Sequence, residues 1–284
     1  MRERPLTVSL AGTPILTAVS PGKSPTWPTD CGRLSSSGAG AILSISHGEQ
    51  SPRRVEQSFF GRRHGRRLRP GRGERLDILL PRLRVAIPLE GGTLEPGALF
   101  EPAVADVWLE IGFGGGEHLA AVAAEKPRIG FIGCEPYVNG IANLLVLVER
   151  FCLGNVRIVD DDARLVLGKL PEASIGRVAL LFPDPWPKKR HANRRFICRE
   201  TLDALARVLR DGAELRIATD EPLLVRWTLA ALIAHPAFRW SPRGPEDWRR
   251  RPADWPATRY EQKALARGAR CTFLRIIRRA RSHP

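Results

Sequence analysis

The sequence has few cysteines, and none of them lies in a paired motif. The five, spread widely along 284 residues, are Cys31, Cys134, Cys152, Cys198 and Cys271. A disulfide framework or a structural zinc site needs clustered cysteines, so we expect neither, and no metal. The pattern favours a reducing compartment, and we predict a cytoplasmic protein.

Long hydrophobic runs are absent as well. No stretch approaches the roughly twenty apolar residues that span a bilayer. Residues 6–19 are mildly apolar and follow two arginines, as in a weak signal peptide, but Pro14 and polar residues interrupt them. We therefore predict neither a membrane span nor secretion.

Acidic residues are the minority among the charged residues, and lysine is scarce. The chain has 45 Lys and Arg against 30 Asp and Glu, which gives a formal charge of +15, and only six of these cations are lysine. A polyanion such as RNA is the expected partner. A membrane surface or a heparin-like polymer would fit the charge equally well, and a GC-rich genome would itself enrich arginine.

The composition divides the chain into three regions. Residues 1–52 are rich in Ser, Gly, Thr and Pro, which is typical of a disordered extension; a transit segment or a mis-chosen start are the alternatives. Residues 53–100 form a basic arm and lead-in, with eleven arginines between Arg53 and Arg84. We expect this arm to contact RNA, the alternative being a solvated basic tail. The remaining residues, 101–284, are predicted to form the catalytic domain.

Short apolar runs alternate with amphipathic runs through this third region. Strands are expected at 107–110, 129–135, 156–160, 178–182 and 214–219, and helices at 117–126, 138–151, 163–170, 195–209 and 221–235. The alternation predicts an α/β fold, with a mostly parallel, Rossmann-like sheet covered by helices on both faces. Ligands bind such sheets at the carboxyl ends of the strands. The run 271–277 is a candidate edge strand.

A glycine-rich turn, EIGFGGG at 110–116, follows the first expected strand. A dinucleotide fingerprint would have glycine where this chain has Glu117, and Glu110 and Glu117 would disfavour a pyrophosphate at the helix N-terminus. A cationic ligand such as S-adenosylmethionine would not be disfavoured. Gly112 and Gly114 would let the backbone approach that ligand closely.

Carboxylates end the next two expected strands. Glu135 lies about twenty residues after the last glycine, where an acidic residue can accept from both ribose hydroxyls. Asp160, Asp161 and Asp162 end the third strand, and Asp162 is the best placed to accept from an adenine amino group. A helix N-cap is the alternative for any one of these aspartates. Three acidic strand ends after a glycine turn nevertheless favour a nucleoside-containing cofactor.

A stiff loop, LFPDPWPKKR at 181–190, follows the fourth expected strand. Three alternating prolines restrict its backbone and hold Asp184 beside Trp186 and a basic run. A carboxylate can accept from the N–H groups of guanine, an indole can cover a base, and the basic run can hold phosphates. A plain turn carboxylate is the alternative for Asp184.

Four ordered motifs resemble those of the bacterial tRNA (guanine-N7-)-methyltransferases: EIGFG at 110–114, FPDPW at 182–186, ATD at 218–220 and TRYE at 258–261. SFFGRRHGR at 58–66 is similar to the basic N-terminal motif of that family. The resemblance implies the seven-stranded class I methyltransferase fold, with S-adenosyl-L-methionine as the methyl donor. It also implies tRNA as the substrate, methylated at N7 of a guanine in the variable loop.

The resemblance further implies roles for single residues. The expected cofactor contacts are Glu110, Gly112, Gly114, Glu135, Asp162 and Asp184, of which Asp184 is also the expected catalytic residue. The expected substrate contacts are Lys188, Asp220, Thr258, Arg259, Tyr260 and Glu261. No obligate protein partner is evident.

The expected chemistry needs positioning more than proton transfer. Guanine N7 carries a free lone pair, and the base becomes cationic on methylation, so Asp184 and Asp220 would orient guanine and offset its charge. Three other functions stay open: a nicotinamide-dependent oxidoreductase, a non-catalytic RNA-binding protein, and an adenine methyltransferase with a related proline loop. Glu117 speaks against the first, the intact carboxylates against the second, and the TRYE motif against the third.

Three tryptophans, Trp240, Trp248 and Trp255, precede the TRYE motif among several arginines. Interleaved tryptophan and arginine can stack on RNA, or the indoles can simply cover a sheet edge. The sequence favours neither reading.

Overall fold

The computed structural model describes residues 61–88 and 91–282, all within one compact unit, Ser46–Pro284. The predicted extension at 1–52 and the start of the basic motif, residues 58–60, lie outside the described residues. Within the described part of the chain, no helix is both long and apolar enough to cross a membrane.

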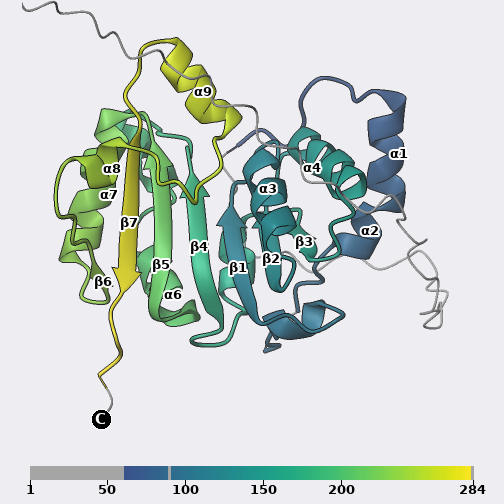
Figure 1. The fold of residues 1–284 in the computed structure, drawn as a ribbon, viewed down its shortest axis with the longest axis horizontal. Coiled ribbons are helices and arrows are strands. Elements are labelled where there is room, and N and C mark those ends of the chain that lie inside the picture. Colours follow the sequence, from purple (N-terminus) through teal and green to yellow (C-terminus); the bar gives the residue numbers. More distant parts are fainter. Residues whose placement is uncertain (1–60, 89–90, 283–284) are drawn as a thin grey trace, which may run out of the picture. The chain divides into compact units, whose positions relative to one another are not determined.

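Seven strands of the described residues form one sheet in the order β3-β2-β1-β4-β5-β7-β6 (Figure 1). Their bounds are β1 Asp106–Ile111, β2 Ile129–Cys134, β3 Val156–Val159, β4 Ile175–Leu181, β5 Leu209–Thr219, β6 Phe238–Arg239 and β7 Thr272–Arg278. β1 to β5 pair in parallel, whereas β7 is antiparallel to both β5 and β6. The strand order reverses beside β1, where sheets of this kind open a crevice for ligands.

The predicted fold class is confirmed, with two local corrections. The run at 271–277 is a strand, but its predicted edge position was wrong, because the two-residue β6 pairs outside it. The predicted helix 195–209 begins only at Arg199. Cys198 is its N-cap residue, and the Cys198 N–H donates to the Thr201 hydroxyl. The helix ends at Val208, and β5 starts at the next residue, Leu209. Residues 195–198 are therefore part of a loop.

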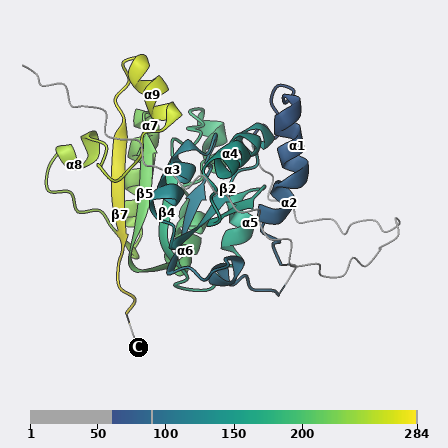
Figure 2. The same cartoon turned by 45° about the vertical axis from the view of Figure 1, so that its right-hand side comes forward.

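Helices cover both faces of the sheet, as the alternating pattern predicted. α5 (Ala163–Leu167), α6 (Arg199–Val208) and α7 (Pro222–Ala234) pack on one face through the largest core cluster. α3 (Glu117–Glu125) and α4 (Val138–Arg150) pack on the opposite face, over β1, β2 and β3. Both views place α9 (Arg259–Ala266) beyond the carboxyl ends of the central strands (Figures 1 and 2).

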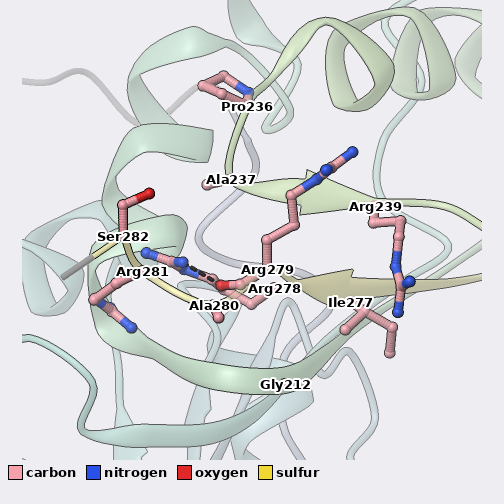
Figure 3. Close-up of a pocket in the computed structure, with 10 residues that line it drawn as sticks. All are labelled: Gly212, Pro236, Ala237, Arg239, Ile277, Arg278, Arg279, Ala280, Arg281 and Ser282. Carbon is pink, nitrogen blue, oxygen red and sulfur yellow. Dashed lines mark hydrogen bonds between the residues drawn. The ribbon is translucent and has the colours of Figure 1, made fainter.

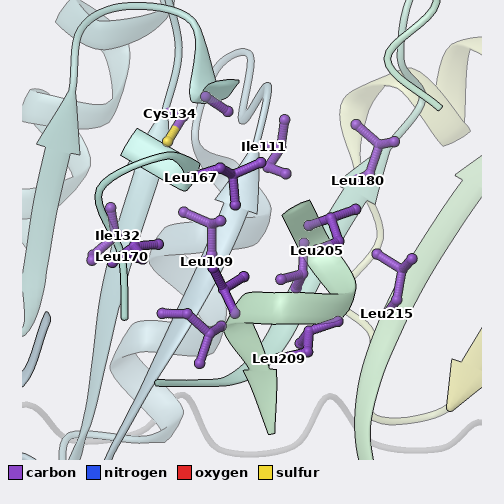
Figure 4. Packing of buried hydrophobic residues seen from close by; sticks show 14 of the residues in the cluster. Leu109, Ile111, Ile132, Cys134, Leu167, Leu170, Leu180, Leu205, Leu209 and Leu215 are labelled. Carbon is purple, nitrogen blue, oxygen red and sulfur yellow. The ribbon is translucent and has the colours of Figure 1, made fainter. Parts of the chain in front are cut away.

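The central strands are apolar on the face toward α5 and α6 because that face is fully enclosed. Leu109 is 2% exposed and Ile132 and Leu215 are 0% exposed, and Figure 4 shows them interleaved with leucines of the covering helices. Burial of each such side chain contributes about 1.5–3 kcal/mol. This rigid core fixes the strand ends from which the site is built.

The basic arm contributes two helices that the sequence did not predict, α1 (Pro70–Ile78) and α2 (Leu80–Leu83). Figure 2 shows both beside α4, and Arg75 of α1 forms an ion pair with Glu149 of α4 at 2.5 Å. The Val85 N–H then donates to the Ile158 carbonyl of β3 at 2.8 Å. The described part of the arm is thus attached to the same domain. α8 (Glu246–Arg249) lies between β6 and β7 in sequence.

Candidate active site

One cavity collects about half of the residues that the motifs predicted. It has a volume of about 460 Å³ and lies where the carboxyl ends of β1, β2 and β4 meet. The predicted residues in its wall are Gly112, Gly114, Glu135, Asp162, Asp184 and Tyr260. The predicted residues outside its wall are Glu110, Lys188, Asp220, Thr258, Arg259 and Glu261. The cavity therefore joins most of the predicted cofactor residues to one predicted substrate residue.

The glycine turn, residues 112–116, needs glycine for its backbone conformation. Gly112, Gly114 and Gly116 have φ angles of 69°, 57° and 77°, in the left-handed region that strains other residues. The turn leads directly into α3, whose first residue is Glu117. Gly112 and Gly114 line the cavity and present only backbone atoms to it.

α4 supports this turn through residues that the sequence analysis did not single out. Asn143 donates from Nδ2 to the carbonyl of Gly115 at 2.5 Å. A Cβ on Gly140 would lie 2.1 Å from the carbonyl oxygen of Gly114, so only glycine allows this approach. An isolated glycine inside a helical pattern is the one signal that would have pointed to Gly140.

Glu135 ends β2 and links the turn to the start of α4. Its carboxylate accepts from the N–H of Gly114 at 2.7 Å and from the N–H of Tyr137 at 3.0 Å. Burial raises the pKa of Glu135 to about 7, with a further increase from the charge of Asp184, while the two N–H donors act in the opposite direction. Each oxygen keeps a second lone pair, so the carboxylate can still accept from a ribose diol.

Glu110 is buried at the end of β1 and faces α3 rather than the cavity. Its Oε2 lies 2.7 Å from Nδ1 of His118, which is also buried. This pair connects β1 to α3 across the glycine turn. A direct contact of Glu110 with the cofactor stays a prediction, whereas its support of the turn is visible in the structure.

Asp162 lines the cavity, but both of its oxygens have partners. It accepts from the N–H of Arg164 at 2.9 Å and pairs with the Arg164 guanidinium at 2.8 Å. It is also the N-cap of α5, the alternative role that the sequence left open. A carboxylate can accept further hydrogen bonds, so the contact with adenine stays a prediction.

The proline loop, residues 182–190, bends sharply at two residues that are not glycine. Phe182 has φ 51° and Trp186 has φ 43°. Such conformations cost about 1–3 kcal/mol each unless the surroundings hold them. Between them Asp184 is exposed, lines the cavity, and makes no hydrogen bond or ion pair to any described residue. Its carboxylate is therefore available to a ligand.

Two consecutive arginines hold this loop, and the sequence analysis did not identify either. The Arg194 guanidinium lies over the Trp186 ring, 5.0 Å from its centroid. Arg195 is buried and donates to the carbonyl oxygens of Pro185 at 3.1 Å and Trp186 at 3.0 Å. In a chain this rich in arginine, no sequence signal distinguishes them from solvated charges.

Lys188 and Asp220 lie outside the cavity wall. Lys188 is exposed and precedes the 3₁₀ helix Lys189–Arg194. Asp220 follows β5 and forms an ion pair with Arg267, just beyond α9. A base that binds Asp220 must share or displace that arginine. Substrate contact by both residues stays a prediction.

The TRYE motif forms the start of α9, and two of its residues are structural. Thr258 is the N-cap and accepts from the N–H of Glu261 at 3.0 Å. Glu261 is buried and pairs with Nε of Arg251 at 3.0 Å. Arg259 is exposed on the first turn. The predicted substrate contacts of these residues stay predictions.

Tyr260 is the residue of this motif that reaches the cavity. A Cβ on Gly114 would lie 3.0 Å from the Tyr260 ring, which shows how closely the ring approaches the glycine turn. Burial raises the pKa of Tyr260, and the negative charges of Glu135 and Asp184 add to this effect. The carboxylates of Glu135 and Asp184 therefore lie near enough to act on the Tyr260 hydroxyl.

The basic arm also reaches the cavity. Arg62 lines it, and residues 61–66 attach to the start of α4 through reciprocal hydrogen bonds with Asn139. Asn139 accepts from the N–H of Gly65 at 2.8 Å and donates to the carbonyl of Arg66 at 2.7 Å. The arm thus places its cations beside the predicted cofactor residues.

The three tryptophans before the TRYE motif serve as cover for the sheet. Trp255 is 1% exposed and packs in a small core cluster with Phe273 of β7. Trp240 and Trp248 contact each other edge to face at 5.5 Å and pack on the main core. Their burial favours the structural reading over stacking on RNA.

A larger hollow of about 940 Å³ lies against Gly212, near the start of β5 and away from the predicted residues (Figure 3). Four arginines line it, but Arg281 is already bonded to Asp211 and Arg278 to the Ala206 carbonyl. These contacts fasten the C-terminal segment to the sheet.

Comparisons with known proteins agree with this geometry. Residues 104–274 match a family described as putative methyltransferase. The tRNA (guanine-N(7)-)-methyltransferase of Paramagnetospirillum magneticum is 55% identical over 224 residues, covering 78% of this chain and 93% of that protein. The protein of the same name from Rhodospirillum rubrum is 50% identical over 228 residues, covering 79% and 89%.

Among solved structures, the 16S rRNA methyltransferase KamB aligns with a TM-score of 0.44 and 15% identity, covering 62% of this chain and 89% of that one. The family assignment rests on the curated relatives, whose identity extends over almost their whole length, and on the glycine turn, Glu135 and the proline loop meeting in one cavity. This chain belongs to the tRNA (guanine-N7)-methyltransferase family.

Proposed function

We propose that this protein transfers a methyl group from S-adenosyl-L-methionine to N7 of a guanine in the variable loop of tRNA. One observation carries the proposal: Asp184, an exposed carboxylate without a hydrogen-bond or ion-pair partner among the described residues, shares a cavity with the glycine turn and Glu135. This shared cavity supports a role for Asp184 as the base acceptor beside a cofactor bound at the glycine turn and Glu135. The relatives named as tRNA (guanine-N(7)-)-methyltransferases support the choice of base and RNA.

The residues present fit S-adenosylmethionine. The cavity of about 460 Å³ is within the range of small-molecule sites, roughly 300–1,000 Å³. Glu135 would accept from the ribose hydroxyls, Asp162 from the adenine amino group, and the glycine turn would lie against the amino-acid end. The carboxylates of Glu135, Asp162 and Asp184 in the cavity wall would suit the positive sulfonium and ammonium groups.

When bound, the cofactor would supply an electrophilic methyl group. The N7 lone pair would form a bond to the methyl carbon as the carbon–sulfur bond breaks, which would leave a thioether and a cationic methylguanine. Asp184 would accept from guanine N1–H and the 2-amino group, and so orient N7 toward the methyl group. Asp184 and Asp220 would also offset the charge that develops on the base. No protein base is needed, because N7 carries no proton.

The RNA side of the proposal rests on charge beside the cavity. Arg62 lines the cavity, and Arg66, Arg67 and Arg69 continue from it as exposed cations without an ion pair to any described residue. We assign these to the tRNA backbone, with Lys188 and Arg259 near the base. We place the protein in the cytoplasm, with residues 101–284 as the methyltransferase domain and 53–100 as its RNA-binding arm.

The decisive experiment is to incubate the purified chain with unmodified tRNA and methyl-labelled S-adenosylmethionine, and to locate the label by mass spectrometry. 7-Methylguanosine in the variable loop is the expected product. Label on adenine would replace the proposal by the adenine methyltransferase, and RNA binding without any transfer would replace it by the non-catalytic RNA-binding protein. Binding of a nicotinamide cofactor in place of S-adenosylmethionine, measured by calorimetry, would point to the oxidoreductase.

A further inference from the structure

We infer that Arg195 is a positioning residue for the proline loop, holding the peptide groups that follow Asp184 so that its carboxylate faces the base. The expected effect on turnover rests on the proposed function. The expected effect on the conformation of the loop rests on the structure alone. It concerns a residue in none of the motifs that carry the family resemblance.

The prolines restrict the backbone of the proline loop, but they leave it few N–H groups with which to hydrogen-bond to the rest of the protein. Its prolines at 183, 185 and 187 lack an N–H donor, and residues 182 and 186 at either side of Pro-Asp-Pro occupy left-handed backbone conformations. On the strand side, the N–H of Phe182 donates to the carbonyl of Ala218 at 2.7 Å. The far side of the bend needs a second attachment.

Arg195 supplies that attachment. Its Nε donates to the Pro185 carbonyl at 3.1 Å and its Nη2 to the Trp186 carbonyl at 3.0 Å. Two N–H groups of one planar guanidinium therefore fix two consecutive peptide groups, directly after Asp184. A lysine presents one ammonium on a flexible stem and cannot reproduce this fork.

The environment of Arg195 indicates a role beyond solubility. Arg195 is only 4% exposed, and its guanidinium forms no ion pair with any described residue. Its charge is met by the two carbonyl dipoles and by the face of Trp227, 4.5 Å from the ring centroid. Trp227 is in turn fixed by its Nε1–H bond to the Ile197 carbonyl at 2.7 Å. Burying a cation without a carboxylate costs free energy. Removing the guanidinium would leave the two carbonyl oxygens without their hydrogen-bond donor.

The chain offers a matched control in Arg207 of α6. Its guanidinium also donates to two backbone carbonyls, those of Leu170 and Leu167, both at 2.6 Å. Neither Arg207 nor its partners line the cavity. The substitutions R195K and R207K therefore remove the same kind of contact, one beside the predicted active site and one away from it.

The test compares wild type, R195K and R207K in tRNA methylation, with turnover normalised to the number of S-adenosylmethionine sites measured by calorimetry. We expect kcat of R195K to fall about 100-fold, the size of effect that a misplacement near 1 Å produces, with a much smaller change in cofactor affinity. R207K is expected to lower the melting temperature without lowering kcat. Equal kcat in R195K and wild type overturns the inference.

Limited trypsin digestion reports on the loop without relying on activity, because Lys188, Lys189 and Arg190 are exposed cleavage sites within it. We expect faster cleavage there in R195K than in R207K or wild type, and equal rates overturn the inference. If wild type transfers no methyl group, the proposed function fails while the digestion still decides the role of Arg195. W227L, which removes the ring beneath the guanidinium together with its hydrogen bond to the Ile197 carbonyl, gives the same readouts should R195K not fold.

Discussion

At the scale of single residues, Asp184 differs from the other predicted carboxylates because no residue in the described part of the chain hydrogen-bonds to it or pairs with it. Glu135 is bonded to two N–H groups, Asp162 caps α5, and Asp220 pairs with Arg267. Glu135 and Asp162 therefore support the cavity as well as line it, whereas Asp220 lies outside its wall. Asp184 makes no hydrogen bond or ion pair within the described residues, so its replacement tests function with little effect on stability.

We predict that D184A lowers methyl transfer by at least about 100-fold, the effect of removing one group that orients or stabilises the reacting base. The melting temperature is expected to stay within about 2 °C of wild type, since surface changes of this kind cost under about 0.5 kcal/mol. Transfer to tRNA and thermal unfolding are measured on the same preparation. E125A, which removes an exposed carboxylate of α3 away from the cavity, is the control; similar activity in D184A and E125A would refute the role of Asp184.

The raised pKa of Glu135 predicts that cofactor affinity depends on pH. Burial raises the pKa of its carboxyl to about 7, so the acceptor for the ribose diol is ionised above that pH and increasingly protonated below it. Affinity for S-adenosylmethionine should therefore fall as the pH is lowered from 8 to 6, approaching about tenfold per pH unit well below the pKa.

Calorimetry of S-adenosylmethionine binding across this pH range checks the prediction. In buffers of different ionisation enthalpy at pH 6, binding should release a proton from the protein. E135Q, which cannot ionise, should bind weakly at every pH and show no such release. A wild-type affinity that does not change from pH 8 to 6 would show that the neutral carboxyl binds equally well.

At the scale of elements, α9 is a short helix whose position decides whether Tyr260 reaches the cavity. Its eight residues are anchored at one end by the Thr258 cap and the Glu261–Arg251 pair. At the other end, Arg267 pairs with Asp220 at the end of β5. The helix therefore connects Tyr260 in the cavity wall to Asp220 at the end of β5.

We predict that T258A destabilises the protein by about 1 kcal/mol, the usual cost of losing an N-cap side chain. Methyl transfer should also fall, because Tyr260 loses its support against Gly114. T258N, which restores a capping side chain, should recover the stability measured by denaturant unfolding. Recovery of activity in T258N would identify Thr258 as a cap, whereas lasting loss of activity with full stability would identify it as a substrate contact.

At the scale of the whole molecule, a charge of +15 makes tRNA binding depend on salt. Each phosphate contact adds about 0.7–0.9 to the slope of log affinity against log salt concentration. Cations of the arm that bind phosphate should therefore be distinguishable from those that only add to the net charge.

We predict that R66A/R67A weakens tRNA binding and reduces that slope by about two. R128A/R239A removes the same charge from two exposed positions outside the cavity wall, one just before β2 and one at the end of β6, and should leave the slope almost unchanged. Filter binding across a series of salt concentrations provides both slopes. Equal slopes in the two double variants would mean that the arm contributes only general charge.

The sequence by itself determined the layer structure and the chemistry of the strand ends. Apolar runs of strand length between amphipathic runs allow little besides a parallel sheet with helices on both faces, and glycines, carboxylates and prolines at the strand ends are local features. The glycine turn, Glu135 and Asp184 were identified for this reason. The family motifs then ordered them into one expected site.

Only the tertiary structure decided which of these residues face the cavity and what holds them there. Glu110 turns to His118, Thr258 and Glu261 support α9, and Arg195 holds the proline loop. Each of these roles depends on contacts with groups that a local pattern does not specify, such as the backbone carbonyls that Arg195 meets. In a chain with dozens of arginines, Arg195 is distinguished only by its burial combined with its bonds to the Pro185 and Trp186 carbonyls, since Arg216 and Arg278 are buried too.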